Sequence, residues 1–281
     1  MKKLVAYFFT DYNLSLQTLR FRQSLYVFLA IKVVYWLWYY DLYFGSNAMA
    51  LASPYSLGGL KNIPFLLYNN TSNSLGYWFI FGTLFFIALS YFIKQIPIIF
   101  EFFLWLLVLN IHNKIYPTLS GGDFLLNQFL FFNCFFSKTY AHNLSWQNAL
   151  SKCVHNISVA GILIQIQLVY LISAAAKLNS SDWLNGIAIS NLIQVNHFNL
   201  YTSPCFIPNS VNYLLNYAVL AYQLLFPILM WVNKLKKPFL VFGICMHMYI
   251  ILVTGLVGFG LIMLIAYIYF WPFKKQAPVD E

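Results

Sequence analysis

A lysine at the end of a long apolar stretch is the residue whose type and position most favour chemistry. In the stretch "LVYLISAAAKLNSSDWLNG", Lys177 follows nine apolar or small residues and precedes a polar turn. On a helix, Tyr170 and Ser173 share its face at spacings of seven and four. A lysine that loses its hydration under a loop can act as a general base. A lysine at a helix end also commonly lays its stem along the apolar surface and keeps its ammonium in water. Spacing alone leaves both interpretations open and favours the second.

The polar turn after Lys177 carries Asp182 and Trp183. Ser180, Ser181 or Asp182 is suited to cap a helix that begins near Trp183. Tryptophan at this position in a membrane protein is usually an interface anchor. Taken alone, this turn therefore has a structural interpretation.

A second polar patch, "LNIHNKIYPTLSGGDFLLNQ", lies next to an apolar segment. Its candidate site residues are Asn110, His112, Asn113, Gly121, Gly122 and Asp123. The two glycines permit backbone shapes that are closed to other residues. Asp123 is expected at the start of the next segment, either as a helix cap or as part of an outer-face pocket with Lys177. A carboxylate beside Lys177 would keep that lysine protonated, so the pocket competes with the base role.

His247 lies near the middle of an apolar segment, in "CMHMYI". An ionisable side chain at membrane depth is a functional candidate by default. A neutral imidazole also forms hydrogen bonds between helices, and the sequence leaves both interpretations open.

Composition sets the class of the protein that positions these residues. Hydrophobic residues make up 61% of the 281 residues, charged residues 8%, and the mean hydropathy is +0.69. A soluble domain has roughly 25% charged residues, so this composition predicts an all-α integral membrane protein with several spans. The formal charge of +9 then concerns topology and lipid contact, and nucleic acid is excluded as a partner.

Runs of apolar residues predict about eight membrane segments. Their ranges are 23–43, 77–93, 96–112, 124–138, 156–177, 211–233, 238–254 and 257–273. The fourth is short, and a re-entrant segment is an alternative there. No second soluble domain is expected, so residues 1–281 are predicted to form a single transmembrane domain.

The basic residues predict the orientation of these segments. With eight spans, 12 of the 16 Lys and Arg residues lie on the side of both termini, three lie opposite, and Lys32 lies in the first segment. The positive-inside rule therefore predicts cytoplasmic termini and, for a bacterial chain, an inner-membrane location. Lys177, Asp182 and Asp123 are expected on the outer side. The long loops at 44–76 and 178–210 are expected to cover that face as lids.

The order of these features resembles the HTTM (horizontally transferred transmembrane) family in its bacterial form. This family is related to the membrane domain of vitamin K-dependent gamma-glutamyl carboxylase. The resemblance covers residues 11–273, and its most specific part is K-L-x-x-x-D-W-x-x-G at Lys177–Gly186. This chain has one more residue between Lys and Asp-Trp than the carboxylase, and Gly-Gly-Asp in place of its Asn-His.

The resemblance implies a role for each candidate residue. Lys177 is implied as the base that deprotonates a reduced quinone at an outer-face site, and Trp183 and Gly186 as motif partners. We expect Asp123, His112 and His247 to be the supporting polar groups. The expected reaction is quinol-linked carboxylase-like, lyase-like or oxidoreductase chemistry. The alternative is a non-catalytic accessory protein that helps a secreted peptide or protein mature, with a membrane or periplasmic protein as partner.

Overall fold

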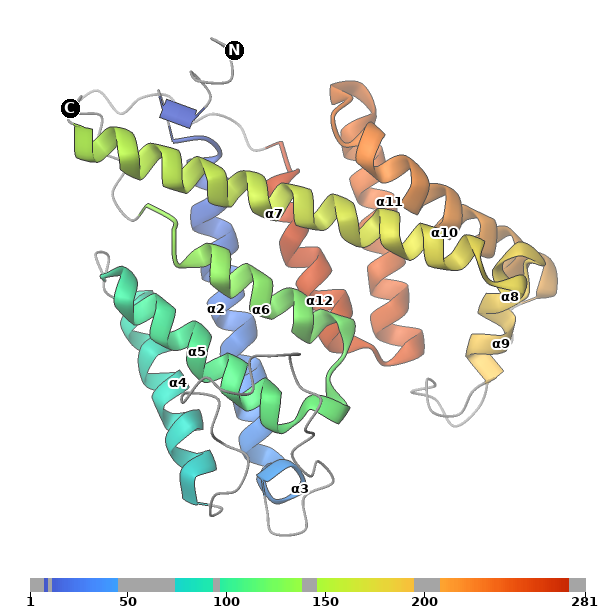
Figure 1. The fold of residues 1–281 in the computed structure, drawn as a ribbon. Helices are drawn as coiled ribbons and strands as arrows, with labels where there is room; N and C mark the ends of the chain where they lie inside the picture. The colour runs from blue at the N-terminus through green and yellow to red at the C-terminus, as the bar shows by residue number, and fades with distance from the viewer. Residues whose placement is uncertain are drawn as a thin grey trace. The chain divides into compact units, whose positions relative to one another are not determined.

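A computed structural model describes residues 8–9, 12–44, 74–92, 97–137, 146–194 and 208–272. These residues form helices, turns and short connections, and the described ranges contain no strand. The chain divides into two compact units, Met1–Ile162 and Leu163–Glu281, and each is described here by itself. Figure 1 shows the helices with their labels.

The first unit packs its helices on α2 and α5. Its elements are α2 (Ser15–Trp38), α3 (Tyr40–Phe44), α4 (Ser74–Phe92), α5 (Ile98–Lys114), η4 (Tyr116–Thr118), α6 (Gly121–Asn133) and the first half of α7 (Trp146–Leu178). Helix α4 packs against both α2 and α5, and α5 packs against α6.

Helix α2 is apolar on both its inner and its outer face. Leu25, Leu29 and Val33 follow one another at intervals of four and are fully buried, whereas Val27 and Ile31 are more than half exposed. A helix that is hydrophobic all round is typical of a membrane environment, because its outer face meets lipid tails. The inner stripe forms the core that brings α2 against α4.

The second unit is built around α10 and α11. Its elements are the second half of α7, α8 (Ser181–Leu184), α9 (Ala188–Gln194), α10 (Asn209–Leu229), α11 (Asn233–Thr254), α12 (Val257–Ala266) and η6 (Tyr267–Tyr269). Helix α10 packs against α9 and α11, and α11 packs against α12.

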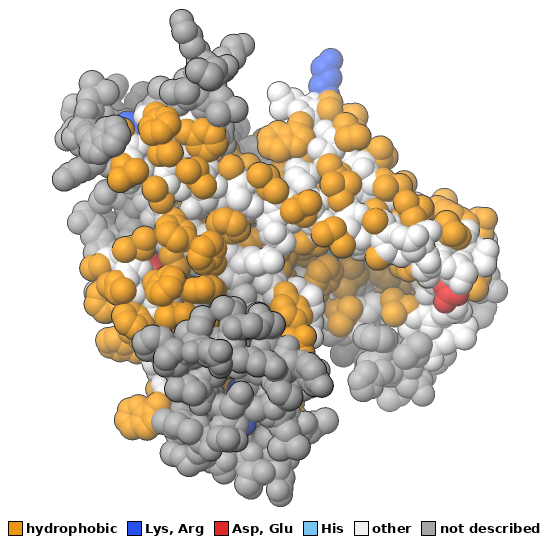
Figure 2. Space-filling model, in the orientation of Figure 1, with side chains coloured by type: hydrophobic (Ala, Val, Ile, Leu, Met, Phe, Trp, Pro, Cys, Tyr) orange, Lys and Arg blue, Asp and Glu red, His pale blue; other side chains and the backbone are white. Residues whose placement is uncertain are grey.

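Within the described residues, three helices are long and apolar enough to cross a membrane. They are the segments Ala149–Leu178, Ser210–Leu229 and Asn233–Thr254 of α7, α10 and α11, and Gly76–Tyr91 and Val257–Tyr269 are shorter apolar helices. Figure 2 shows hydrophobic side chains spread over the visible face, with few charged ones among them. The chain is therefore an all-helical protein with the features of a multi-pass membrane protein, as its composition predicts.

Each of the eight predicted ranges contains a helix, but several predicted ends are wrong. Helix α7 begins at Trp146, ten residues before the predicted start, because polar residues such as Lys152 and His155 are buried there instead of ending the helix. Helix α6 has 13 residues, or about 20 Å at 1.5 Å per residue, which is shorter than the ~30 Å of a bilayer core. The number of spans and the side of the termini stay predictions. Residues 45–73, most of the first predicted lid, and residues 195–207, a smaller part of the second, lie outside the described residues.

Candidate functional site

The segment from Lys177 to Ile187 folds as a tight connection between α7 and α9, which we call the Lys177 connector. Ser180 stands at the N-cap position of α8, and its carbonyl accepts from the Leu184 backbone N–H at 3.1 Å. The Asp182 carbonyl accepts from the Ile187 N–H at 2.9 Å. The predicted capping site is therefore at Ser180, although its side chain makes no capping hydrogen bond.

Lys177 lies inside this connector with a polar and an aromatic neighbour. Its Nζ donates to Ser173 Oγ at 2.7 Å, one helical turn earlier, as the spacing predicts. The same atom lies 4.8 Å from the centroid of the Trp183 ring, a distance at which a cation is attracted to an indole. Among the described residues, no carboxylate lies within 4 Å of Lys177. The amine is thus positioned by Ser173 and Trp183 and not by an acid.

Helix α10 fixes the far side of the connector. The Asn216 Nδ2 donates to the Trp183 carbonyl at 2.8 Å, and the Tyr217 hydroxyl donates to the Leu184 carbonyl at 2.6 Å. These carbonyls belong to a short helix that leaves its last C=O groups without intrahelical partners. The two side chains bond to these carbonyls, of which that of Trp183 also accepts from the Gly186 N–H at 3.3 Å, and so tie the connector to α10.

Gly186 has a physical reason to be glycine. Its φ of +75° lies in the left-handed region, where a side chain is strained. A Cβ atom at this position would overlap the Tyr213 ring. The last residue of the Lys177–Gly186 block therefore lets α10 approach the connector closely.

Asp182 is directed away from Lys177 toward α9. Its Oδ2 accepts a hydrogen bond from Asn191 Nδ2 at 3.0 Å. This bond ties the connector to α9, so the motif aspartate has a positioning role within this unit.

His247 belongs to a buried chain of hydroxyl groups in the second unit. Its Nε2 lies 2.8 Å from the Tyr170 hydroxyl, which is also hydrogen-bonded to the Tyr267 hydroxyl. Tyr267 in turn lies 2.8 Å from the Tyr222 hydroxyl. The predicted interhelical hydrogen bond of His247 is confirmed, between α11 and α7. His247 Nδ1 is buried without a hydrogen-bond partner among the described residues.

Gly243 makes room for this chain of hydroxyls. A Cβ on Gly243 would overlap the hydroxyl oxygens of both Tyr222 and Tyr267. Phe226 stacks on the Tyr170 ring at 4.0 Å between centroids and screens the chain with an apolar surface. Buried hydroxyls are costly unless they are paired, and these three are paired with one another and with His247.

In the first unit, Asp123 pairs with a lysine that the sequence analysis left without a partner. Asp123 Oδ1 accepts from Lys32 Nζ on α2, and His112 Nε2 of α5 lies 3.8 Å from the same oxygen. The side chains of Lys32 and Asp123 are 17% and 6% exposed, so this is a buried ion pair. The Trp36 ring packs edge-on against the His112 imidazole at 5.4 Å. Both nitrogens of His112 lack a hydrogen-bond partner among the described residues.

Asp123 is also part of the start of α6, but it is not the N-cap. Ser120 stands at the N-cap, Gly121 and Gly122 form the first turn, and Asp123 is the third helical residue. Its Oδ2 accepts from the Ser120 N–H at 2.8 Å and from the Ser120 hydroxyl at 2.9 Å. The interpretation of Asp123 as the N-cap is therefore wrong. The N-cap is Ser120, three residues earlier, because serine is also a favoured N-cap residue and precedes the two glycines.

A second buried charge cluster in the first unit was not predicted. Glu101 on α5 is 1% exposed and pairs with Arg22 of α2. It also accepts from the Tyr26 hydroxyl at 2.6 Å and from Asn133 Nδ2 at 2.9 Å. Lys94, which precedes Glu101 by seven residues and would share its side of a continuous helix, lies outside the described residues. Side chains from two helices, α2 and α6, donate to this carboxylate on α5, which makes it a structural centre of the unit.

The structure thus brings the candidate residues together in three groups. In the first unit, His112 and Asp123 lie beside Lys32. In the second unit, Lys177 lies beside Trp183, on the connector that also contains Gly186. In the same unit, His247 is hydrogen-bonded to Tyr170. Asn110 turns inward on its own helix, where its Nδ2 donates to the Leu106 carbonyl at 2.7 Å. The pocket that would join Asp123 to Lys177 stays a prediction, since the two residues lie in different units.

Sequence reasoning missed Lys32 and Tyr170 as partners. Lys32 carried one signal, because it is a lysine inside an apolar segment and requires a buried counter-charge there. Comparison of the chain with protein families, curated proteins and solved structures finds no match in any of the three. The HTTM resemblance therefore rests on the residues quoted above.

Proposed function

We propose that this chain is a membrane-embedded enzyme of the HTTM and vitamin K-dependent carboxylase-like type, with Lys177 as the general base. The observation that carries the proposal is the setting of Lys177. Its amine is held by Ser173 and Trp183, while the nearest candidate acid on its own connector, Asp182, bonds to Asn191. A carboxylate partner would keep the amine protonated, and the described residues supply none at this site.

The hydrogen bonds of Lys177 leave it free to take up a proton. A neutral amine has two N–H donors and one lone pair, and one donor is used by Ser173 Oγ. The lone pair accepts the proton from the substrate hydroxyl, and the second N–H stays available for another acceptor. Trp183 stabilises the ammonium that forms, because its ring face attracts cations.

The donor set at Lys177 fits the hydroxyl of a reduced quinone. Ser173 and Lys177 offer two polar groups, one turn apart on α7, in an otherwise apolar stretch that suits the tail of such a molecule. A reduced quinone, when bound, supplies electrons for the reaction that follows deprotonation. Lys177 removes the proton, Trp183 fixes the amine, and Asn216 holds Trp183 in place.

The other candidate residues act as supporting groups in this proposal. His247 holds Tyr170, which lies on the same helix as Lys177, two turns earlier. Asp123 and His112 form, with Lys32, the polar centre of the first unit. We propose that they shape the outer side of the bundle without touching the transferred proton.

The proposal also sets the topology: eight segments, both termini in the cytoplasm, and Lys177 at the outer face of the inner membrane. The test is Ser180→Cys in a chain without other cysteines, labelled in intact cells and in inverted vesicles. Labelling by an impermeant reagent from the outside is expected. Labelling from the cytoplasmic side alone overturns the topology.

The chemical role is tested by purifying the protein from membranes and identifying bound lipids and proteins by mass spectrometry. We expect a co-purifying quinone that is lost in Lys177→Ala and kept in Lys114→Ala, a matched change at another helix end that is also predicted to be external. Size-exclusion chromatography of each variant separates loss of ligand from loss of fold.

Lys177→Arg separates the base role from simple charge. Arginine keeps the positive charge over Trp183 but stays protonated at all accessible pH values. We expect the variant to keep its fold and to lose quinone-dependent turnover by at least the 10²-fold typical of a removed general base. If the protein instead carries a stoichiometric protein partner and no quinone, and Lys177→Ala leaves that partner bound, the chain is an accessory protein for peptide maturation or secretion.

A further inference from the structure

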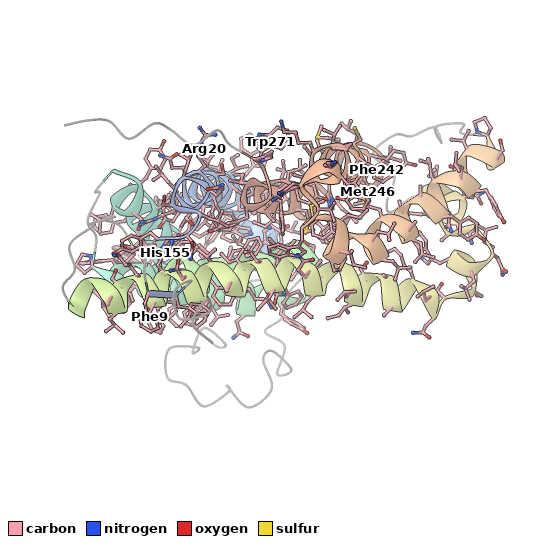
Figure 3. All side chains as sticks on the ribbon, turned by 90° about the horizontal axis from the view of Figure 1, so that it is seen from above. Phe9, Arg20, His155, Phe242, Met246 and Trp271 are labelled. Carbon is pink, nitrogen blue, oxygen red and sulfur yellow. The ribbon has the colours of Figure 1, made fainter. Side chains whose placement is uncertain are left out.

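Helices α10 and α11 form the walls of a groove that is open at the surface of the second unit. Its volume is about 390 Å³, and its walls are apolar, with Ala218 and Ala221 on one side and Phe239 and Phe242 on the other. The two alanines are short, so they leave space that larger side chains would fill. In Figure 3, Phe242 and Met246 mark one turn of α11 beside this groove.

The groove runs along two helices that are each long and apolar enough to cross a membrane. Its lining residues on α10 extend from Ala218 to Leu229, which is about 16 Å of helix at 1.5 Å per residue. No water is present at membrane depth to fill such a space, so a lipid chain is the molecule that occupies an open apolar groove there.

One end of the groove carries a concentration of positive charge. Leu229 and Leu235 line the groove on either side of the α10–α11 turn, and Lys234, Lys236 and Lys237 lie within the first five residues of α11. The first turn of α11 has no acidic residue. Asp182 is the only acid within 163–194 and 208–272, and it lies on the connector beside the opposite end of α10.

The same turn has the marks of a membrane interface. Trp231 is 62% exposed between the two helices, as an interfacial anchor would be. Lys236 lies with its Nζ 5.8 Å from the Phe270 ring, so its stem lies along an apolar surface near the start of α11. Lysines near the ends of membrane helices attract the negative headgroups of anionic lipids.

We propose that this groove is a binding site for one anionic glycerophospholipid. The lipid phosphate is attracted to this end of the groove by the combined charge of Lys234, Lys236 and Lys237, and one acyl chain lies between α10 and α11 against Ala221 and Phe242. The site is separate from the Lys177 connector, and it does not depend on the proposed enzyme activity.

In the test, the purified chain is placed in nanodiscs of equal parts phosphatidylglycerol and phosphatidylethanolamine. It is then released into detergent, and native mass spectrometry identifies the lipid that stays bound. We expect one phosphatidylglycerol to stay bound in preference to phosphatidylethanolamine. Changing all three lysines to glutamine is expected to weaken this binding about a hundredfold, from the contribution of each lysine to binding at an anionic surface. Ala221→Phe fills the groove and is expected to remove the bound lipid with the lysines intact.

The matched control is Leu224→Phe, which adds an aromatic ring at an exposed position of α10 outside the groove. This variant is expected to keep the lipid, and size-exclusion chromatography checks the fold of every variant. Equal retention of the two lipids, or full retention in the lysine variant, overturns the proposal. Inorganic phosphate that competes as well as the whole lipid also overturns it, because the acyl chain would then add nothing.

Discussion

The buried pair between Lys32 and Asp123 gives the sharpest prediction about stability. Two single variants test it. Lys32→Met removes the cation and keeps a long apolar side chain. Asp123→Asn removes the anion and keeps an oxygen for the Ser120 donors. The pair joins α2 to α6 with side chains 17% and 6% exposed. Each single variant leaves one buried charge unpaired, which costs about 3–5 kcal/mol of unfolding free energy.

The double variant Lys32→Met, Asp123→Asn is expected to lose less than either single variant. Replacing both members of a buried ion pair by uncharged residues is often neutral, because neither charge must be desolvated. We expect the double variant to lie within about 2 kcal/mol of the native protein. The two changes are thus strongly non-additive, as expected of residues in direct contact.

The measurement is unfolding of the purified protein in detergent micelles by titration with a denaturing detergent, followed by helical circular dichroism. Two exposed charges serve as controls: Asp41→Asn, in the same unit, and Lys234→Met. Both are expected to change the unfolding free energy by less than about 0.5 kcal/mol. Single variants that cost less than about 1 kcal/mol, or a double variant equal to the sum of the two, refute the reasoning.

The remaining predictions concern the second unit. Gly186→Ala is expected to lower the unfolding free energy by about 1–3 kcal/mol, because Gly186 has a φ of +75° and its Cβ would overlap the Tyr213 ring. The control Gly82→Ala, on α4, has space for a methyl group and should be neutral or stabilising. Equal effects of the two changes in thermal unfolding would contradict this. Tyr267→Phe leaves Tyr222 and Tyr170 short of a partner and is expected to cost about 1–3 kcal/mol. The exposed Tyr77→Phe should cost less than about 0.5 kcal/mol in the same assay, and a harmless Tyr267→Phe would mean that the hydroxyl chain is not formed. Asn216→Ala removes the side-chain donor to the Trp183 carbonyl and is expected to expose the connector to proteolysis. Asn191→Ala is expected to have a smaller effect, because its hydrogen bond to Asp182 is more exposed than that of Asn216. Equal cleavage rates of the two variants would argue against α10 as the support of Trp183.

The class of the fold was predictable because it depends on composition and on the length of apolar runs. A helix in lipid satisfies its own backbone hydrogen bonds, so a long apolar run already predicts the element that it forms. The ends of the helices were less predictable. Lys152 and His155 look like polar residues that precede a span, yet both are buried within α7.

The local part of the candidate site was predictable, and the distant part was not. Ser173 lies four residues before Lys177, and helical geometry alone places it within reach of the amine. Lys32 and Asp123 are 91 residues apart, and Tyr170 and His247 are 77 apart. Such pairs depend on which helices pack together, and a single sequence does not specify that packing.

The length of α7 has a consequence for how the protein sits in lipid. At 33 residues the helix is about 50 Å long, whereas a bilayer core of ~30 Å is crossed by about 39 Å of helix even at the steepest usual tilt of about 40°. The N-terminal part of the helix makes protein contacts: His155 bonds to the Asn13 carbonyl at 3.1 Å, and the Lys152 Nζ lies 5.8 Å from the Tyr12 ring. His155 is marked there in Figure 3. We therefore expect the excess length to lie in this protein-contacted part, and we expect a change in bilayer thickness to alter the tilt of α7 and so to move Lys177 at its other end.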